Sequence, residues 1–172
     1  MEFEEYVSAR GQELVRLGFT VSGDYQRAED LAQIALMQAF RSWRKVRTAH
    51  DPHHYVRRIL VNEYLSMTRR RSFSEAPTAD LEPHRTVPDH ATHVVNSDDL
   101  WRALATLSAR ERVVLVLRYY QDLDDQTIAD MLGIKPSSVR ATASRALASL
   151  RRARDSTRDS TRDSDRVDER LS

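Results

Sequence analysis

The chain has no cysteine, and only four of its 172 residues are glycine. The absence of cysteine excludes disulfide bonds and thiolate metal sites. There is also no glycine-rich loop of the kind that holds a phosphate. No apolar run approaches the roughly eighteen residues that a membrane-spanning helix needs. The amino terminus does not resemble a signal peptide, so we expect a soluble, cytoplasmic protein without membrane insertion.

The signatures of common enzyme sites are missing as well. The six histidines fall in residues 50–54 and 84–93, and none lies in the helical pattern by which zinc proteases bind their metal. No serine lies in a nucleophile elbow. We therefore expect no catalysis, no cofactor and no metal site.

Charge is unevenly distributed, although the formal net charge is only +1. Residues 41–71 hold nine basic side chains and two acidic ones, and a second basic stretch lies near residues 140–154. Such patches in a nearly neutral chain favour two separate contacts with a polyanion.

Apolar residues recur at helical spacing along most of the chain. The spacing predicts helices over residues 3–21, 28–43, 54–71, 96–107 and 108–122, with residues 18–24 as a helix end and loop. Phe40 is expected in the core. Ser108 and Glu111 form a capping-box pattern, which favours a buried helix for the Val113–Leu117 run. The fold class is therefore all-α.

Residues 123–152 have the pattern of a helix-turn-helix. Gly133 closes the first short helix, and Ser137 or Ser138 is expected to cap the second. Val139, Ala143 and Ala146 share one face of that second helix. Its other face is expected to carry polar and basic side chains suited to a DNA major groove: Ser138, Arg140, Thr142, Ser144 and Arg145. The alternative is a solvated basic face.

The 54–71 helix has a comparable polar side. Tyr55, Arg58, Asn62 and Arg69 are spaced three, four and seven apart, so they share a face. An aromatic ring, an amide and arginines can bind single-stranded or melted nucleic acid by stacking, hydrogen bonding and charge. Taken alone, the pattern is better explained by an ordinary exposed polar face.

Composition divides the chain. We expect a first domain over 1–72, a flexible proline-bearing linker over 73–96, a helix-turn-helix domain over 97–154, and a tail over 155–172. The tail repeats Arg-Asp-Ser-Thr without hydrophobic residues, so it is expected to be disordered.

Four features in this order resemble an extracytoplasmic-function sigma factor of the SigE-type branch: Ala28–Gln33, the helix around Asn62, the linker and the terminal helix-turn-helix. The resemblance implies a non-catalytic specificity subunit with a region 2 and a region 4. Its implied partners are core RNA polymerase and promoter DNA. An anti-sigma factor is a further partner that the resemblance allows.

The resemblance also implies roles for individual residues. The polymerase clamp would be contacted by Glu29, Asp30 and Gln33. The melted minus-ten element would be contacted by Lys45, Arg47, His54, Tyr55, Arg58, Asn62 and Arg69. The duplex minus-thirty-five element would be contacted by Ser138, Arg140, Thr142, Ser144 and Arg145.

The main alternative is a stand-alone helix-turn-helix regulator that binds duplex DNA without polymerase, usually as a dimer on a palindrome. A third possibility is an adaptor that binds only a protein partner.

Overall fold

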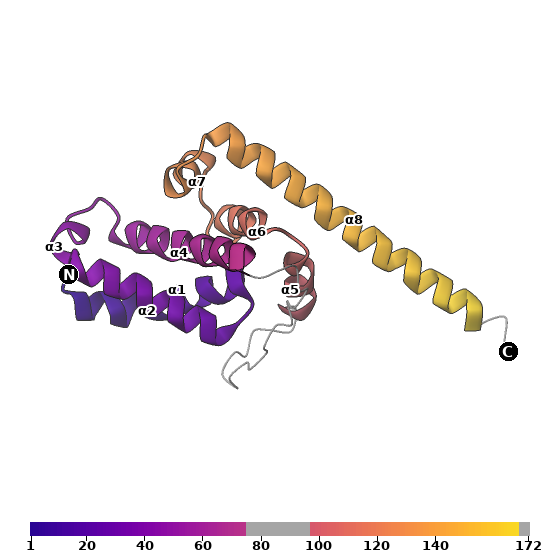
Figure 1. Cartoon of the computed structure of the whole chain (residues 1–172), viewed down its shortest axis with the longest axis horizontal. Coiled ribbons are helices and arrows are strands. Elements are labelled where there is room, and N and C mark those ends of the chain that lie inside the picture. The colour runs from indigo at the N-terminus through magenta and orange to yellow at the C-terminus, as the bar shows by residue number, and fades with distance from the viewer. Residues whose placement is uncertain (75–96, 169–172) are drawn as a thin grey trace.

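The structure is a computed structural model that describes the backbone of residues 1–74 and 97–168, and the side chains of residues 1–73 and 101–155. Regular structure in these ranges is helical (Figure 1), which confirms the all-α class. The elements are α1 (Phe3–Ser22), α2 (Tyr25–Arg41), α3 (Trp43–Val46), α4 (Pro52–Ser74), α5 (Ser97–Ala105), α6 (Ala109–Leu115), the π-helical segment η1 (Val116–Tyr120), α7 (Asp125–Leu132) and α8 (Pro136–Asp168).

Helices α1, α2 and α4 pack together as a first helical group. α1 crosses α2 closely at Gly18, where a Cβ atom would lie 3.0 Å from the backbone of Ala28. α1 continues to Ser22 and is capped by Gly23, whose φ of 70° is left-handed. The predicted helix over residues 3–21 is therefore confirmed to within one residue, but the loop expected within residues 18–24 is wrong up to Ser22, which is still helical. Gly18 allows the close crossing, and Gly23 terminates the helix.

α2 begins where Asp24 accepts a hydrogen bond from the backbone N–H of Arg27 at 2.8 Å. Its inner face buries Leu31 and Ala35, but Phe40 is 58% exposed. The expectation that Phe40 belongs to the core is therefore wrong. Its ring packs against that of Phe3, with 4.9 Å between the ring centroids.

The second helical group contains α5, α6, η1, α7 and α8. Ser108 and Glu111 form the expected capping box at the start of α6. The Val113–Leu117 run is fully buried in α6 and η1, which confirms it as a buried helix. Gly133, with φ of 64°, ends α7 as expected.

α8 begins at Pro136 and not at a serine cap. The carbonyl of Lys135 accepts hydrogen bonds from the backbone N–H groups of Ser138 and Val139. Proline suits the first helical position because the N–H that it lacks would have no partner there. The expected cap at Ser137 or Ser138 is therefore wrong, whereas the buried face with Val139 is confirmed.

The backbone of α8 remains helical to Asp168, through most of the stretch that was expected to be disordered from residue 155. Extending an existing helix requires no new nucleus, so α8 can continue beyond the residues whose apolar side chains recur at helical spacing. In Figure 1 it projects beyond the other helices. The expected linker lies outside the described residues, apart from residues 73 and 74 at the end of α4.

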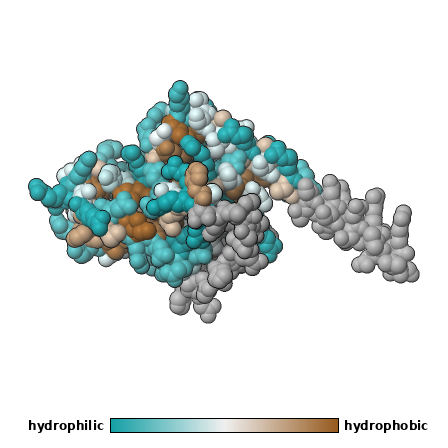
Figure 2. Space-filling model, in the orientation of Figure 1, coloured by the Kyte–Doolittle hydropathy of each residue, from teal (hydrophilic) through white to brown (hydrophobic). Residues whose placement is uncertain are grey.

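The two helical groups touch each other. α4 packs against α6 and α7 (Figure 1), and the buried apolar side chains form one continuous cluster. None of the described helices is long and apolar enough to cross a membrane. The face drawn in Figure 2 is mostly hydrophilic, with apolar patches over α4 and α7.

Candidate nucleic-acid interface

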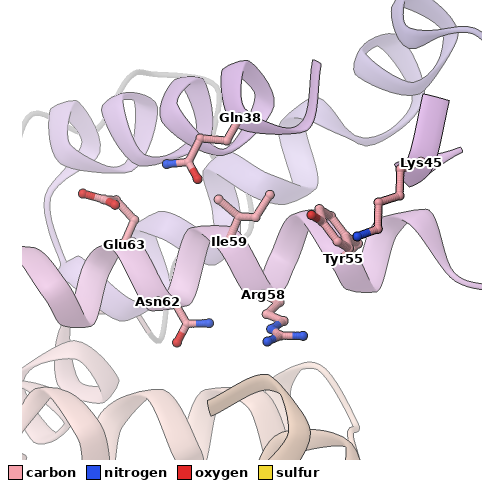
Figure 3. A pocket seen from close by; sticks show the side chains of 7 residues that line it. All are labelled: Gln38, Lys45, Tyr55, Arg58, Ile59, Asn62 and Glu63. Carbon is pink, nitrogen blue, oxygen red and sulfur yellow. The ribbon is translucent and has the colours of Figure 1, made fainter. Parts of the chain in front are cut away.

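A hollow of about 490 Å³ lies along α4. Figure 3 shows Gln38 reaching toward it from α2 and Lys45 from α3, while the other lining residues come from α4. We term this hollow the α4 groove. It is lined by Gln38, Lys45, Tyr55, Arg58, Ile59, Asn62 and Glu63.

Four residues predicted for one DNA contact meet in this groove. Tyr55, Arg58 and Asn62 share a side of α4 because helical spacings of three and four return to the same face. Lys45 joins them from the separate helix α3. Sequence reasoning missed Gln38 and Glu63, and it assigned Ile59 to the apolar side. The polar residues Gln38 and Glu63 carry no local signal that distinguishes them from other surface positions.

The groove presents uncompensated positive charge. Among the residues that the structure describes, neither Lys45 nor Arg58 forms an ion pair, and both are exposed. The acidic lining residue, Glu63, is paired with Arg70 at 2.8 Å. Two free cations beside an aromatic ring and an amide form a surface suited to a single nucleic-acid strand.

The other three residues predicted for the minus-ten contact do not line the groove. Arg47 is paired with Glu2 at 3.0 Å. The backbone N–H of His54 donates to Asp51 at 2.9 Å, at the start of α4. Burial lowers the pKa of the His54 side chain, and nearby Arg57 lowers it further. Arg69 is exposed farther along α4.

α2 carries a second exposed row. Asp30, Gln33, Met37 and Phe40 follow one another at spacings of three and four, which places them on one side of the helix. All four are exposed, and Met37 and Phe40 are large hydrophobic residues with 48% and 58% of their surface accessible. We term this row the α2 stripe. Asp30 and Gln33 were predicted, whereas Met37 and Phe40 were missed. Glu29, also predicted, is half-buried beside it.

The polar face of α8 agrees with four of its five predicted members. Ser138, Arg140, Ser144 and Arg145 are exposed. Arg140 lies 3.7 Å from Asp125 of α7, in an ion pair that leaves its side chain 61% exposed. Surface pairs of this kind are weak, so Arg140 can exchange this partner for a phosphate or a base edge.

Thr142 does not lie on that face. It is only 5% exposed, and its hydroxyl accepts a hydrogen bond from Arg145 at 3.2 Å. The expectation that Thr142 faces DNA is therefore wrong. Its position, three residues after Val139 and four before Ala146, lies within the buried side of α8.

Models of known protein families match both helical groups. The model of Sigma-70 region 2 matches residues 6–73, and that of Sigma-70, region 4, matches residues 97–150. The first match covers the α4 groove and the α2 stripe, and the second covers the helix-turn-helix. A stand-alone helix-turn-helix regulator is therefore not favoured.

Relatives and solved structures agree with this assignment. RNA polymerase sigma-E factor of Streptomyces avermitilis is 32% identical over 91% of this chain and 87% of its own, and that of Streptomyces coelicolor is 32% identical over 88% and 85%. The ECF RNA polymerase sigma factor SigM of Mycobacterium tuberculosis is 29% identical over 87% and 76%.

The fold also resembles sigma factor RpoE of Bartonella quintana, solved with the anti-sigma factor NepR. The TM-score is 0.67 at 21% identity, over 87% of this chain and 94% of that one. The chain belongs to the extracytoplasmic-function sigma factors of the sigma-70 family, which bind core RNA polymerase and direct promoter-specific transcription initiation.

Proposed function

We propose that the α4 groove holds the melted minus-ten strand, that the α2 stripe contacts the polymerase clamp, and that the exposed face of α8 contacts the minus-thirty-five duplex. The protein acts in the cytoplasm and catalyses no reaction itself. An anti-sigma factor is a further proposed partner, because the Bartonella quintana relative was solved with one.

The observation that carries the minus-ten assignment is the composition of the groove. Arg58 and Lys45 supply charge for phosphates, the Tyr55 ring supplies a stacking surface, and Asn62 supplies an amide for a base edge. The hollow is open along α4, so an unstacked base can enter it while the sugar-phosphate backbone follows the cations.

Arg58→Ala tests this assignment in the complete holoenzyme. We expect permanganate reactivity of the melted promoter region to fall about tenfold, in line with about 1–3 kcal/mol for a lost stacking or charge contact. Co-purification with core polymerase should be unchanged, because Arg58 lies outside the α2 stripe. Arg16→Ala, at an exposed arginine of α1, is the matched control. Normal promoter melting by Arg58→Ala holoenzyme would refute the assignment.

A further inference from the structure

An acidic side chain lies between two arginines in the helix-turn-helix domain. Asp125 is the first residue of α7, and α7 packs against α8 (Figure 1). One oxygen of its carboxylate, Oδ1, lies 3.5 Å from Nη1 of Arg118 in η1. The other oxygen, Oδ2, lies 3.7 Å from Nη1 of Arg140 in α8. The carboxylate therefore connects η1, α7 and the predicted DNA-contacting face of α8.

Asp125 is the least exposed member of this set. Its side chain is 18% exposed, against 32% for Arg118 and 61% for Arg140. Oδ1 is buried and accepts no hydrogen bond from the residues that the structure describes. A buried oxygen without such a partner is destabilising, but the charge of Arg118 and the amino-terminal end of α7 favour an anion there. The carboxylate is held between the helices, and Arg140 is the member that can move.

The start of α7 does not need the Asp125 carboxylate as a cap. Asp124 is the cap residue, and its carboxylate accepts hydrogen bonds from the backbone N–H and the hydroxyl of Thr127, at 2.8 and 3.0 Å. The distances from Asp125 to its arginines are longer than hydrogen bonds of good geometry. The position of Asp125 between two arginines therefore calls for an explanation other than capping.

The proposed duplex contact offers Arg140 two kinds of partner, a base edge or a phosphate. Guanine accepts two hydrogen bonds from one guanidinium, and this contact favours the correct base by about 5–150-fold. An exposed ion pair changes an equilibrium by about fivefold or less. A base edge can therefore draw Arg140 away from Asp125.

A phosphate is disfavoured at the same place, because it carries the same sign of charge as Asp125. A phosphate within reach of the Arg140 guanidinium also lies close to the carboxylate, and the two anions repel each other. Like charges brought together in this way act against the wrong partner. An uncharged base edge meets no such repulsion.

We propose that Asp125 is a positioning residue that directs Arg140 to a base edge and away from phosphates. It raises the specificity of the minus-thirty-five contact without contacting DNA itself. The inference rests on the proposed role of the exposed face of α8 in that contact. Arg145 provides an internal comparison, because it donates to the Thr142 hydroxyl of its own helix at 3.2 Å. The base preference of Arg145 should not depend on Asp125.

Asp125→Asn removes the charge and keeps the size of the side chain. Asp130→Asn is the matched control, because Asp130 lies on the same helix, is exposed, and accepts a hydrogen bond from Gln126 at 3.1 Å. Arg140→Ala and Arg145→Ala identify the base pairs that each arginine reads, as the positions where preference is lost. The double variant Asp125→Asn with Arg140→Ala tests whether Asp125 acts through Arg140.

The first measurement is base preference. Holoenzyme reconstituted with each variant binds promoter fragments whose minus-thirty-five element is randomised, and the bound fragments are sequenced. We expect Asp125→Asn to lower the preference about threefold at the base pair read by Arg140, and to leave the preference at the Arg145 base pair unchanged. Asp130→Asn should match the parent, and the double variant should match Arg140→Ala.

The second measurement is binding of the same holoenzymes to a duplex without a promoter. Asp125→Asn should bind this duplex about threefold more tightly at low salt. The slope of log affinity against log salt should become steeper by up to about 0.9, the value for one added phosphate contact. The double variant should show neither change. An affinity and slope equal to those of the parent would contradict the repulsion of phosphates by Asp125.

The two measurements separate the inference from the proposed function. If Arg140→Ala alters no base preference, the minus-thirty-five role of Arg140 fails, and the inference fails with it. If Arg140→Ala alters a preference that Asp125→Asn leaves intact, the inference alone fails. Equal losses at the Arg140 and Arg145 base pairs would show that Asp125 only supports the fold, which would also overturn the inference.

Discussion

At the scale of single residues, burial separates side chains that the sequence pattern treats alike. Thr142 and Arg145 both belong to a polar set on α8, but Thr142 is buried and orients Arg145 through its hydroxyl. His53 is another case, because a histidine near the end of a basic loop has no predictable role. In the structure its Nδ1 lies 2.9 Å from the Tyr6 hydroxyl and its Nε2 lies 3.2 Å from Glu13.

This environment makes His53 a determinant of stability at mildly acidic pH. Burial lowers the pKa of His53, and Arg57 and Arg10 lower it further, against the opposing effects of Glu13 and Asp51. Near the ordinary histidine pKa of about 6.5, the unfolded chain therefore binds more protons than the folded protein. The contribution of neutral His53 to the free energy of unfolding is fully present above that pH. It is lost as the pH falls below it, toward the lower pKa of the folded protein.

We predict that the melting temperature falls by a few degrees between pH 7.5 and pH 5.5, since about 1 kcal/mol shifts Tm by about 2–4 °C at this size. His54 contributes in the same direction, because burial also lowers its pKa. His53→Gln should remove part of the fall, and His50→Gln, at an exposed position, should not. An equal fall in His53→Gln and the parent, measured by circular dichroism, would contradict this role.

At the scale of elements, apolar periodicity located most helices correctly, but their ends depend on capping groups. The pattern of Ser108 and Glu111 correctly placed the start of α6, because both reciprocal hydrogen bonds lie within four residues. At α8 a serine was available, yet Pro136 begins the helix. The π-helical segment η1 had no recognisable signal in the sequence. It ends beside Gln121, whose side-chain carbonyl accepts a hydrogen bond from Arg57 of α4.

A pair of serine substitutions tests the two helix starts. Ser108→Ala removes the acceptor of the Glu111 backbone N–H, so we predict a loss of about 1 kcal/mol in the free energy of unfolding. Ser137→Ala should change it by less than about 0.5 kcal/mol, because Ser137 is exposed and caps nothing. Urea denaturation measures both. If Ser137→Ala lowered the free energy of unfolding more than Ser108→Ala does, the result would show that Ser137 caps α8 after all.

At the scale of the whole molecule, the surfaces that we propose for the three contacts are separate. The α2 stripe faces away from the core, the α4 groove presents Lys45 and Arg58, and α8 exposes Arg140 and Arg145. The two helical groups are nevertheless packed together through α4, α6 and α7.

Charge reversal on the α2 stripe tests assembly with the polymerase. We predict that Asp30→Arg weakens binding to core polymerase about tenfold or more. The substitution reverses the charge at the proposed contact, and an arginine opposite the basic group that an aspartate would contact costs several kcal/mol. The variant should stay folded, since Asp30 is exposed. Asp155→Arg reverses an exposed charge on α8 and serves as the control. Retention of Asp30→Arg on immobilised core polymerase at parental affinity would exclude the stripe as the contact.

The sequence by itself determined the all-α class, the helix-turn-helix with its Gly133 turn, and the shared face of Tyr55, Arg58 and Asn62. Each of these follows from hydrogen bonds and side-chain spacings within a few residues along the chain. Only the tertiary structure decided that Lys45 joins that face, that Phe40 is exposed, and that Arg112 and Trp101 join the two groups. These features depend on the packing of residues far apart in the chain, which a local pattern does not encode.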